Sequence, residues 1–525
     1  MSYVITCLVF VLFLGSVAWQ VSRKATPEDI LAPGTMRTLW GTWIGLTVLA
    51  FLSGSGMLFL AAASATLVWV RKKAPALVIY AIFLTAVPPM IFPLSGFGPI
   101  NNLIDLSYQR LLVWLVLLPA LMVARREKDY KPLGHHTADW LGIAYGLLIF
   151  ALQLRLDSLT NSLRVMLYFF SDNFWVYFAF SRLIRTREDF QRVLWALVVG
   201  VTATTLTAIY EQRTSWLLYD IVDEGLGLRG SFSYLIRSGT GLLRAYGSSG
   251  HPLILGMLTT TSLIWAAGCR QNFSSPKQRN WAAAVMLCLA GALFASQARG
   301  MWVGAAVGWL VWVLTGPKVF KQLALLGAVG GVVLMIALST DTGRSIIETL
   351  PFIGTKDQDN VDYREQLFTV SLLVIKENFF FGTFNFFDHP LMQSLVQGQG
   401  IVDPVNVFII YALNSGMVGF SLFAGAWIEA LWGVYKRVRQ SRLADEVLST
   451  LGRAHLAALV AMVVMITTTS LVGTIPNMIW VCIGLSMAFC DLVDTQTKAA
   501  LKERQRRNAT KPPQATTRPS KSFAR

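Results

Sequence analysis

A set of arginines occupies polar segments between long apolar stretches of the sequence. Its members are Arg229, Arg237, Arg244, Arg299, Arg344 and Arg364. A guanidinium group is planar, stays charged at any working pH and can form two parallel hydrogen bonds with a phosphate. Several such groups at a membrane surface would form a site for a phosphate or pyrophosphate group. Any one arginine taken alone is better explained as a side chain that reaches lipid headgroups, but the sequence around Arg244 and Arg299, given below, favours the site.

Proton transfer at such a site would need a carboxylate or an imidazole close to the arginines. Side chains of these kinds in the same polar segments are Glu211, His251, Asp362, Glu365, His389 and Asp403. Asp403 is the first choice, because it stands close to Asn406 at the start of an apolar stretch. A helix cap is an equal alternative for Asp403, since Asp followed by Pro is common at a helix start. His251, which precedes Pro252, has the same two interpretations.

The apolar stretches that must position these residues place the chain in a membrane. Hydrophobic residues make up 54% of the chain and charged residues 14%, with a mean hydropathy of +0.53, whereas a soluble domain carries about 25% charged residues. We expect an all-α, polytopic transmembrane bundle of about fourteen spans. The stretches lie near residues 3–21, 38–70, 75–94, 105–124, 137–154, 162–181, 193–210, 251–268, 281–298, 301–316, 322–340, 404–425, 455–474 and 478–493.

The second stretch is too long for one straight span. Ser53-Gly54-Ser55-Gly56 either breaks it into a hairpin or lies within one tilted helix. The two alternatives put the N-terminus on opposite faces of the membrane, and the sequence leaves both open.

Basic residues gather after every second span from residue 71 onward. The clusters are Arg71, Lys72 and Lys73; Arg125, Arg126, Lys128 and Lys131; Arg182, Arg185, Arg187 and Arg192; Arg270, Lys277 and Arg279; Lys318 and Lys321; and Lys436, Arg437, Arg439 and Arg442. By the positive-inside rule, these clusters and the C-terminus are cytoplasmic. Two polar segments, about 211–250 and 341–403, then form outer loops, and apolar runs within the second predict short helices lying on the bundle. The bundle spans 1–497, and 498–525 form a basic tail that we expect to be disordered.

Charge and cysteine content argue against other classes of protein. The net charge is +16, but it is dispersed in short clusters between spans, so we expect no nucleic-acid partner. None of the five cysteines forms a CxxC pair, so the cysteines indicate neither a metal site nor a disulfide framework. His135 and His136 are cytoplasmic by topology and are poor candidates for an outer site. Asp172, near the middle of a span, is expected to face the interior in a structural role.

Four short motifs follow one another in the second half of the chain. They are Leu243-Arg244-Ala245-Tyr246-Gly247 leading to His251-Pro252, Ser296-Gln297-Ala298-Arg299-Gly300-Met301-Trp302, Tyr363-Arg364-Glu365-Gln366-Leu367 leading to Phe381-Gly382, and Asp403-Pro404-Val405-Asn406 leading to Asn414-Ser415-Gly416. Each motif alone is weak, but their order on the predicted outer face resembles the O-antigen ligase and polymerase superfamily of bacterial envelopes. The resemblance covers about residues 240–425.

The resemblance implies a GT-C-like membrane glycosyltransferase that uses no metal and no other cofactor. Such enzymes transfer a glycan from undecaprenyl pyrophosphate to an acceptor hydroxyl at the outer face of the bacterial inner membrane, with inversion at the anomeric carbon. The essential arginines of the family match Arg244 and Arg299 by position, and Arg364 matches a third. We therefore expect a catalytic set of Arg244, Arg299, Asp403 and Asn406, and a substrate-binding set of Arg237, Arg244, His251, Arg299 and Arg364. The expected partners are the lipid-linked glycan, the bilayer, and a chain-length regulator or flippase of the same pathway.

One departure from the family pattern bears on the reaction. Family ligases commonly have a histidine directly before the asparagine that matches Asn406, and here that position is Val405. We therefore favour a surface-polysaccharide polymerase, with an O-antigen ligase as the alternative. A flippase for lipid-linked oligosaccharides is a further alternative, but it should show pseudo-symmetric halves and a polar central cavity, whereas this sequence places its polar residues in two outer loops. The arginines at the outer span ends argue against an inactive structural subunit.

Overall fold

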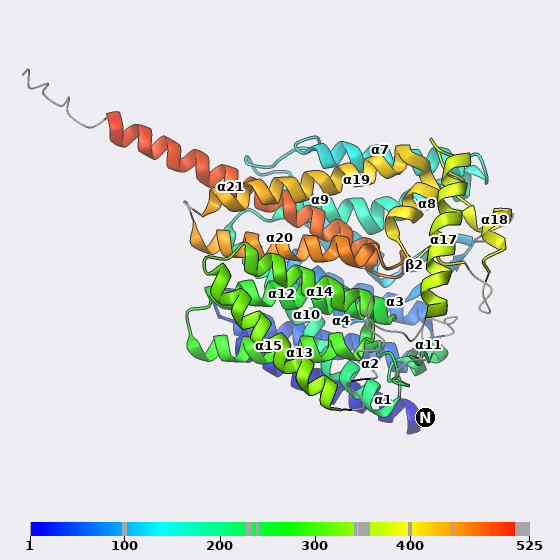
Figure 1. Ribbon diagram of the computed structural model, residues 1–525, viewed down its shortest axis with the longest axis horizontal. Coiled ribbons are helices and arrows are strands. Elements are labelled where there is room, and N and C mark those ends of the chain that lie inside the picture. Colours follow the sequence, from blue (N-terminus) through cyan, green and yellow to red (C-terminus); the bar gives the residue numbers. More distant parts are fainter. Residues whose placement is uncertain are drawn as a thin grey trace, which may run out of the picture.

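The computed structural model describes residues 2–96, 102–226, 234–237, 241–340, 344, 358–396, 402–442 and 445–509. Long helices lie side by side and alternate in direction, so that loops gather at two opposite ends (Figure 1). The uninterrupted helices of the bundle are α1 (Ser2–Ala25), α2 (Pro33–Leu52), α3 (Gly56–Val70), α4 (Ala76–Ala86), α7 (Thr137–Gln153), α10 (Arg187–Thr214), α12 (Pro252–Asn272), α13 (Pro276–Ala295), α14 (Arg299–Leu314), α15 (Val319–Ser339), α19 (Val407–Ser441), α20 (Glu446–Ile466) and α21 (Ile475–Ala509). Two more contain a π-helical turn. One consists of α5 (Tyr108–Leu112), η1 (Val113–Leu117) and α6 (Leu118–Ala124), and the other of α8 (Leu159–Phe169), η2 (Phe170–Phe174) and α9 (Trp175–Leu183).

The described part of the chain contains six helices that are long and apolar enough to cross a membrane. These are α1, α10, α12, α19, α20 and α21. Shorter apolar helices, such as α3, α4, α7 and α14, pack among them. Together they confirm the prediction of an all-α, multi-pass membrane protein. The last helix, α21, continues to Ala509, beyond residue 498 where the predicted tail begins, and residues 510–525 lie outside the described residues.

The second apolar stretch forms a hairpin. Helix α2 ends at Leu52 and α3 begins at Gly56, and Gly54 between them has a φ of +57°, a conformation that favours glycine. Phe51, at the end of α2, contacts Tyr219 just beyond the end of α10, so α2 and α10 run in the same direction. This hairpin adds one segment to the fourteen predicted.

The N-terminus consequently lies at the end of the bundle that is opposite the basic clusters. The Trp216 indole, which follows α10, donates a hydrogen bond of 2.6 Å to the Tyr3 hydroxyl. Contacts at the other end join the predicted basic clusters to one another. They include Arg185 with Glu127, Arg187 with Asp445, Asn272 with Val447, and Arg442 with Thr315. The common location of these clusters agrees with the topology predicted from the sequence, and α21 leaves the bundle at this end (Figure 1).

The bundle is not helical throughout, because the predicted span at 75–94 ends early. Helix α4 stops at Ala86, and the chain then forms an antiparallel pair of strands, β1 (Ile91–Ser95) and β2 (Asn102–Ser107). The pair leads directly into α5 at Tyr108, on which Phe59 of α3 packs with 6.1 Å between the ring centroids. The strands therefore lie at the end of the bundle that holds the N-terminus.

Two ion pairs, one partly and one fully buried, join helices inside the bundle. Asp172 in η2 accepts hydrogen bonds from Arg110 in α5, at 2.8 Å in the closest contact, which gives this acid the interior position that the sequence predicted. Asp139 at the start of α7 pairs with Arg182 at the end of α9, and both side chains are fully buried. The Tyr177 hydroxyl also donates to Asp139, at 2.5 Å. Each pair fixes the position of one helix against another.

Asp139→Asn is expected to lower the free energy of unfolding by about 3–5 kcal/mol, because it leaves the Arg182 charge buried without its counter-ion. Thermal unfolding of the purified protein in detergent measures this loss. Asp129→Asn, in the exposed segment before α7, is the matched control and should unfold at the wild-type temperature. Equal unfolding temperatures for the two variants would contradict the proposed importance of the pair.

Candidate functional site

The segment that carries Arg244 forms a small hairpin beyond the end of α10. Ile236 and Leu243 form an isolated antiparallel bridge, and the Arg244 N–H donates to the carbonyl of Leu235 at 2.9 Å. Arg237 lies on the other arm of this hairpin. The next residue, Ala245, donates its N–H to the carbonyl of Ala295 at the end of α13, at 3.0 Å. The hairpin is therefore fastened beside the turn that leads to Arg299.

The carboxylate of Glu211 holds this segment in place. Glu211 is fully buried at the end of α10 and accepts backbone N–H groups from Leu218, Tyr246 and Gly247, at 3.2, 3.0 and 2.7 Å. A carboxylate with three backbone donors is strongly oriented. Among the candidate proton acceptors in the sequence, Glu211 thus positions the backbone that follows Arg244.

Glu211→Gln should reduce glycan formation about 100-fold, since the amide end of Gln presents N–H groups to backbone donors and small displacements at a reacting site can cost this much. The measurement is gel analysis of cell-surface glycan, with the amount of membrane-inserted protein determined by immunoblot. Glu188→Gln, at the opposite end of α10, is the control and should behave as wild type. Unchanged glycan in Glu211→Gln would show that the anchor is dispensable.

His251 lies at the start of α12 and is neutral. Its Nδ1 accepts the N–H of Leu253 at 3.2 Å, so the ring caps the helix. Burial, and then the positive charge of Arg244, lower the pKa of His251 to about 4. In the neutral ring, acceptance at Nδ1 leaves the proton on Nε2. The structure therefore supports the helix-cap interpretation of His251, and its role in the site stays a prediction.

Arg364 reaches the same place from the second outer segment. It lies on α17 (Gln358–Glu377), which runs across the ends of the bundle helices (Figure 1), as the apolar runs of this segment predicted. Burial lowers the pKa of Arg244, and the positive charge of Arg364 lowers it further. The Arg244 side chain is half-buried and Arg364 is exposed, and an anion between two such like charges would favour the charged form of both. The Arg244 Nε atom is buried and, within the described residues, has no hydrogen-bond partner, so it can donate to a ligand.

Among the described carboxylates, Asp403 is the one whose negative charge raises the pKa of Arg364. Burial raises the pKa of Asp403, while a hydrogen bond from the Ser470 hydroxyl and the charge of Arg364 act in the opposite direction. Ser470 lies in the turn between α20 and α21. Asp403 therefore accepts a hydrogen bond from a distant turn and interacts through its charge with Arg364, and it does not cap α19.

Asn406 is the residue that caps α19. Its carboxamide oxygen accepts the N–H groups of Phe408 and Ile409, at 3.0 and 3.3 Å. This use of the oxygen accounts for an asparagine at this position without any contact to a substrate. Asn406 therefore stands three residues after Asp403 and acts as the N-cap of α19.

Arg299 is the first residue of α14 and is half-buried. The following residue, Gly300, packs so closely on Thr468 that no Cβ atom would fit between them. Thr468 belongs to the same turn as Ser470. Arg299 therefore begins its helix between the Arg244 hairpin and the turn that contacts Asp403.

Two further motif positions are glycines at which the segment after α17 meets α19. Gly382 and Gly416 have positive φ angles of +64° and +62°, and Gly416 marks a kink in α19. The Thr383 N–H donates to the carbonyl of Leu413, and the Met417 N–H donates to the carbonyl of Phe379, at 2.9 and 2.8 Å. The segment after α17 is thus joined to the kink of α19, which holds α17 over the site.

Other candidates from the sequence lie elsewhere. His389 pairs with Glu377 at 3.0 Å, and Arg344 donates to the carbonyl of Leu338 at 2.7 Å. Arg229 lies outside the described residues. Asp362 and Glu365 line a groove of about 600 Å³ on α17, together with Gln366, Thr369, Val370 and Leu395. Residues two positions apart point to different sides of a helix, so Asp362 faces away from Arg364.

Comparison with known proteins agrees with this architecture. Residues 284–424 match the family model described as O-antigen ligase, while a search of the curated proteins found no match. The matched region runs from α13 into α19 and holds Arg299, Arg364, Asp403 and Asn406. Fold and site together define a multi-pass membrane protein with an arginine-rich site at one end. The match supports the resemblance predicted from the motifs. Residues 284–424 are similar to the O-antigen ligase family, which indicates an enzyme of the ligase or polymerase type.

Proposed function

We propose that this protein is a polymerase of bacterial surface polysaccharide. It transfers glycan repeat units from a polyprenyl pyrophosphate, such as undecaprenyl pyrophosphate, to a sugar hydroxyl at the outer face of the inner membrane. The observation that carries the proposal is the pair of guanidinium groups of Arg244 and Arg364, whose like charges interact with each other and with the side chains of Asp403 and His251. The site lies at the end of the bundle opposite the basic clusters, which agrees with an outward-facing site and a cytoplasmic C-terminus.

The chemistry of a pyrophosphate leaving group suits this arrangement. The bond between the anomeric carbon and the pyrophosphate oxygen breaks, and its electron pair leaves with the pyrophosphate. Arg244 and Arg364, with Arg299 nearby, stabilise the added negative charge with preorganised donors. The Nε2–H of neutral His251 adds a further donor without adding charge.

The acceptor side of the reaction needs a base. The acceptor hydroxyl oxygen forms the new bond to the anomeric carbon from the face opposite the leaving group, and its proton passes to Asp403. Burial raises the pKa of Asp403, which makes it a stronger base than an exposed aspartate. The Ser470 hydroxyl, which donates to Asp403, holds the carboxylate in position.

An O-antigen ligase is the second candidate, because the matching family model carries that description. The two reactions share the donor and differ in the acceptor, which is a glycan in one case and a lipid core in the other. Val405 occupies the position at which family ligases commonly carry histidine, and this departure favours the polymerase.

A reconstituted assay distinguishes these candidates. The purified protein in liposomes is supplied with a lipid-linked repeat unit, alone or together with a lipid-core acceptor. A ladder of longer lipid-linked chains from the repeat unit alone is the expected result. Transfer only when the core acceptor is present would establish a ligase, and no transfer under either condition would overturn both assignments.

The membrane orientation can be tested independently. Gln366→Cys on α17 should react with a membrane-impermeant maleimide in intact cells from which the outer membrane has been removed, whereas Lys128→Cys at the other end should react only after lysis. Both positions are exposed. The reverse labelling pattern would place the site in the cytoplasm and would contradict the proposal.

A further inference from the structure

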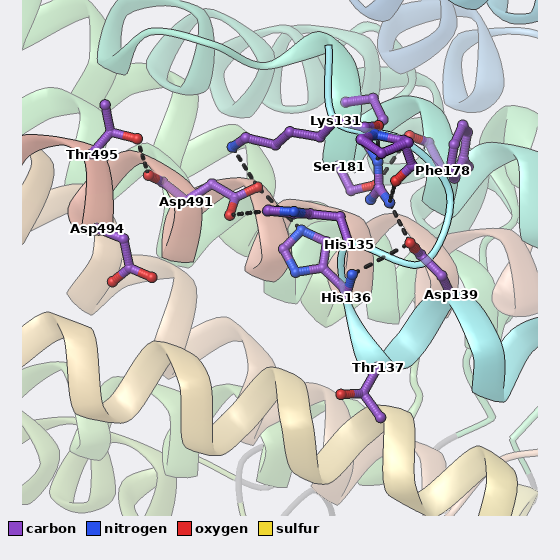
Figure 2. A network of polar contacts seen from close by, with 12 residues as sticks. Lys131, His135, His136, Thr137, Asp139, Phe178, Ser181, Asp491, Asp494 and Thr495 are labelled. Atoms are coloured by element: carbon purple, nitrogen blue, oxygen red, sulfur yellow. Dashed lines mark hydrogen bonds and ion pairs between the residues drawn. The ribbon is translucent and has the colours of Figure 1, made fainter. Parts of the chain in front are cut away.

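A second cluster of polar side chains lies at the opposite end of the bundle. His135 and His136, just before α7, both direct Nε2 at the carboxylate of Asp491 on α21 (Figure 2). The distances are 3.2 Å from His135 to Oδ1 and 3.1 Å from His136 to Oδ2. His136 and Asp491 are largely buried, whereas the His135 side chain is 39% exposed. The site therefore has an inner part and an opening to solvent.

The spacing of these atoms suits a small divalent metal ion. One ligand atom from each of the three residues lies within 4.8 Å of the others. In a tetrahedral site with bonds of 2.0–2.2 Å, neighbouring ligand atoms are about 3.3 Å apart, which is close to the distances seen between the imidazoles and the carboxylate. Two imidazoles with one carboxylate are a donor set typical of Zn²⁺ and related transition ions. A water molecule would complete the coordination.

The segment that carries the histidines is fixed before any ion binds. The Gly134 N–H donates to Asp139 at 2.8 Å, and the His136 N–H donates to the same oxygen at 3.4 Å. Arg182, which pairs with Asp139, also donates to the carbonyls of Lys131 and Pro132, both at 3.2 Å. Figure 2 shows Asp139 on the side of the histidines away from Asp491. Contacts of this kind hold the segment that carries the two histidines in place.

A lysine shares the carboxylate with the histidines. The Lys131 ammonium group lies 2.7 Å from Oδ2 of Asp491, the oxygen that also faces His136. An ion at the cluster would take the place of this ammonium group, and the lysine side chain, which is 34% exposed, can turn toward solvent. Lys131 therefore competes with the ion for Asp491. Its removal should tighten ion binding, which would not be expected if the cluster had a structural role alone.

We propose that His135, His136 and Asp491 form a binding site for a divalent transition-metal ion of the Zn²⁺ class. The ion joins the start of α7 to the last helix, where α21 leaves the bundle. The site is distinct from the arginine-rich site at the other end and takes no part in the transfer reaction.

The full-length protein, freed of any histidine tag, tests this proposal in detergent. Zn²⁺ binding is measured by calorimetry, and Co²⁺ is used as a coloured probe whose visible absorption reports tetrahedral nitrogen and oxygen ligands. One ion should bind per chain, and His135→Ala and His136→Ala should each weaken binding more than about 100-fold, beyond the loss caused by removing an outer-shell partner. Lys131→Met should bind more tightly than wild type. His389→Ala, a histidine at the other end, should bind as wild type does.

Two results would overturn the site. The first is a wild-type protein that binds no ion in either measurement, and the second is binding that survives both alanine variants. If a histidine variant proves poorly folded, Lys131→Met decides the question, because binding no tighter than wild type would also contradict the proposal.

Discussion

Arg244→Ala is expected to abolish the polymer at the cell surface while the protein still inserts into the membrane. Removal of one preorganised donor from a site that stabilises developing negative charge costs about 10²–10³ in rate. Arg244 is a strong case because its Nε atom is buried without a partner in the described part of the protein, so the alanine variant loses a donor and leaves no buried acceptor behind. Purified variants are compared by the rate of chain extension.

Matched variants separate charge from geometry at this position. Arg244→Lys keeps the charge but loses the planar fork, so its rate should fall between those of wild type and Arg244→Ala. Arg213→Ala removes an exposed arginine at the end of α10 and should extend chains at the wild-type rate. Normal polymer in Arg244→Ala, and also in Arg299→Ala, would remove the proposed pyrophosphate site.

Asp403→Asn should have the second large effect, because an amide cannot accept the proton of the acceptor hydroxyl. General-base catalysis contributes about 10²–10⁴ in rate, and a loss of this size is expected in the extension assay. Asp362→Asn is the matched control, since Asp362 lies on the other side of α17 and lines a separate groove. A wild-type rate in Asp403→Asn together with a loss in Asp362→Asn would reassign the base.

The pH dependence gives a further test of the same residue. A base works only when deprotonated, so the rate should fall as the pH drops through the pKa of Asp403. Because burial raises this pKa, the fall should begin at a higher pH than for an exposed aspartate. Ser470→Ala removes a hydrogen bond that favours the charged form, so it should move the fall to still higher pH. An unshifted profile in Ser470→Ala would show that this hydroxyl does not act through Asp403.

Hydropathy was sufficient to predict the class of the fold but not its irregular parts. The stretch at 38–70 contains its own break, yet only the contact between Phe51 and Tyr219 shows that α2 and α3 form a hairpin. The strands at 91–107 were missed because short apolar runs do not distinguish a strand from the end of a buried helix. Their Pro93 and Ser95 were the available signals of a break in the helix.

The candidate site could be proposed from the sequence because its arginines stand in recognisable motifs. Arg244, Arg364, His251 and Asp403 come from three segments, and the charges of neighbouring members of this set shift the pKa values of Arg244, His251 and Arg364. Ser470 could not be predicted, since it lies 67 residues after Asp403 in a turn rich in hydroxyl groups. The capping role of Asn406 depends on where α19 begins, and the ends of helices are the part of a fold that a sequence specifies least well.

The lipid-linked intermediates of cells that lack this protein test the central claim most directly. Extracted polyprenyl-linked glycans are separated by size, and their leaflet is assigned by accessibility to an added glycosidase. The polymerase predicts that single repeat units accumulate on the outer leaflet and that long glycan disappears. Accumulation of complete chains on the lipid would contradict this account in favour of a ligase, and single units confined to the inner leaflet would contradict it in favour of a flippase.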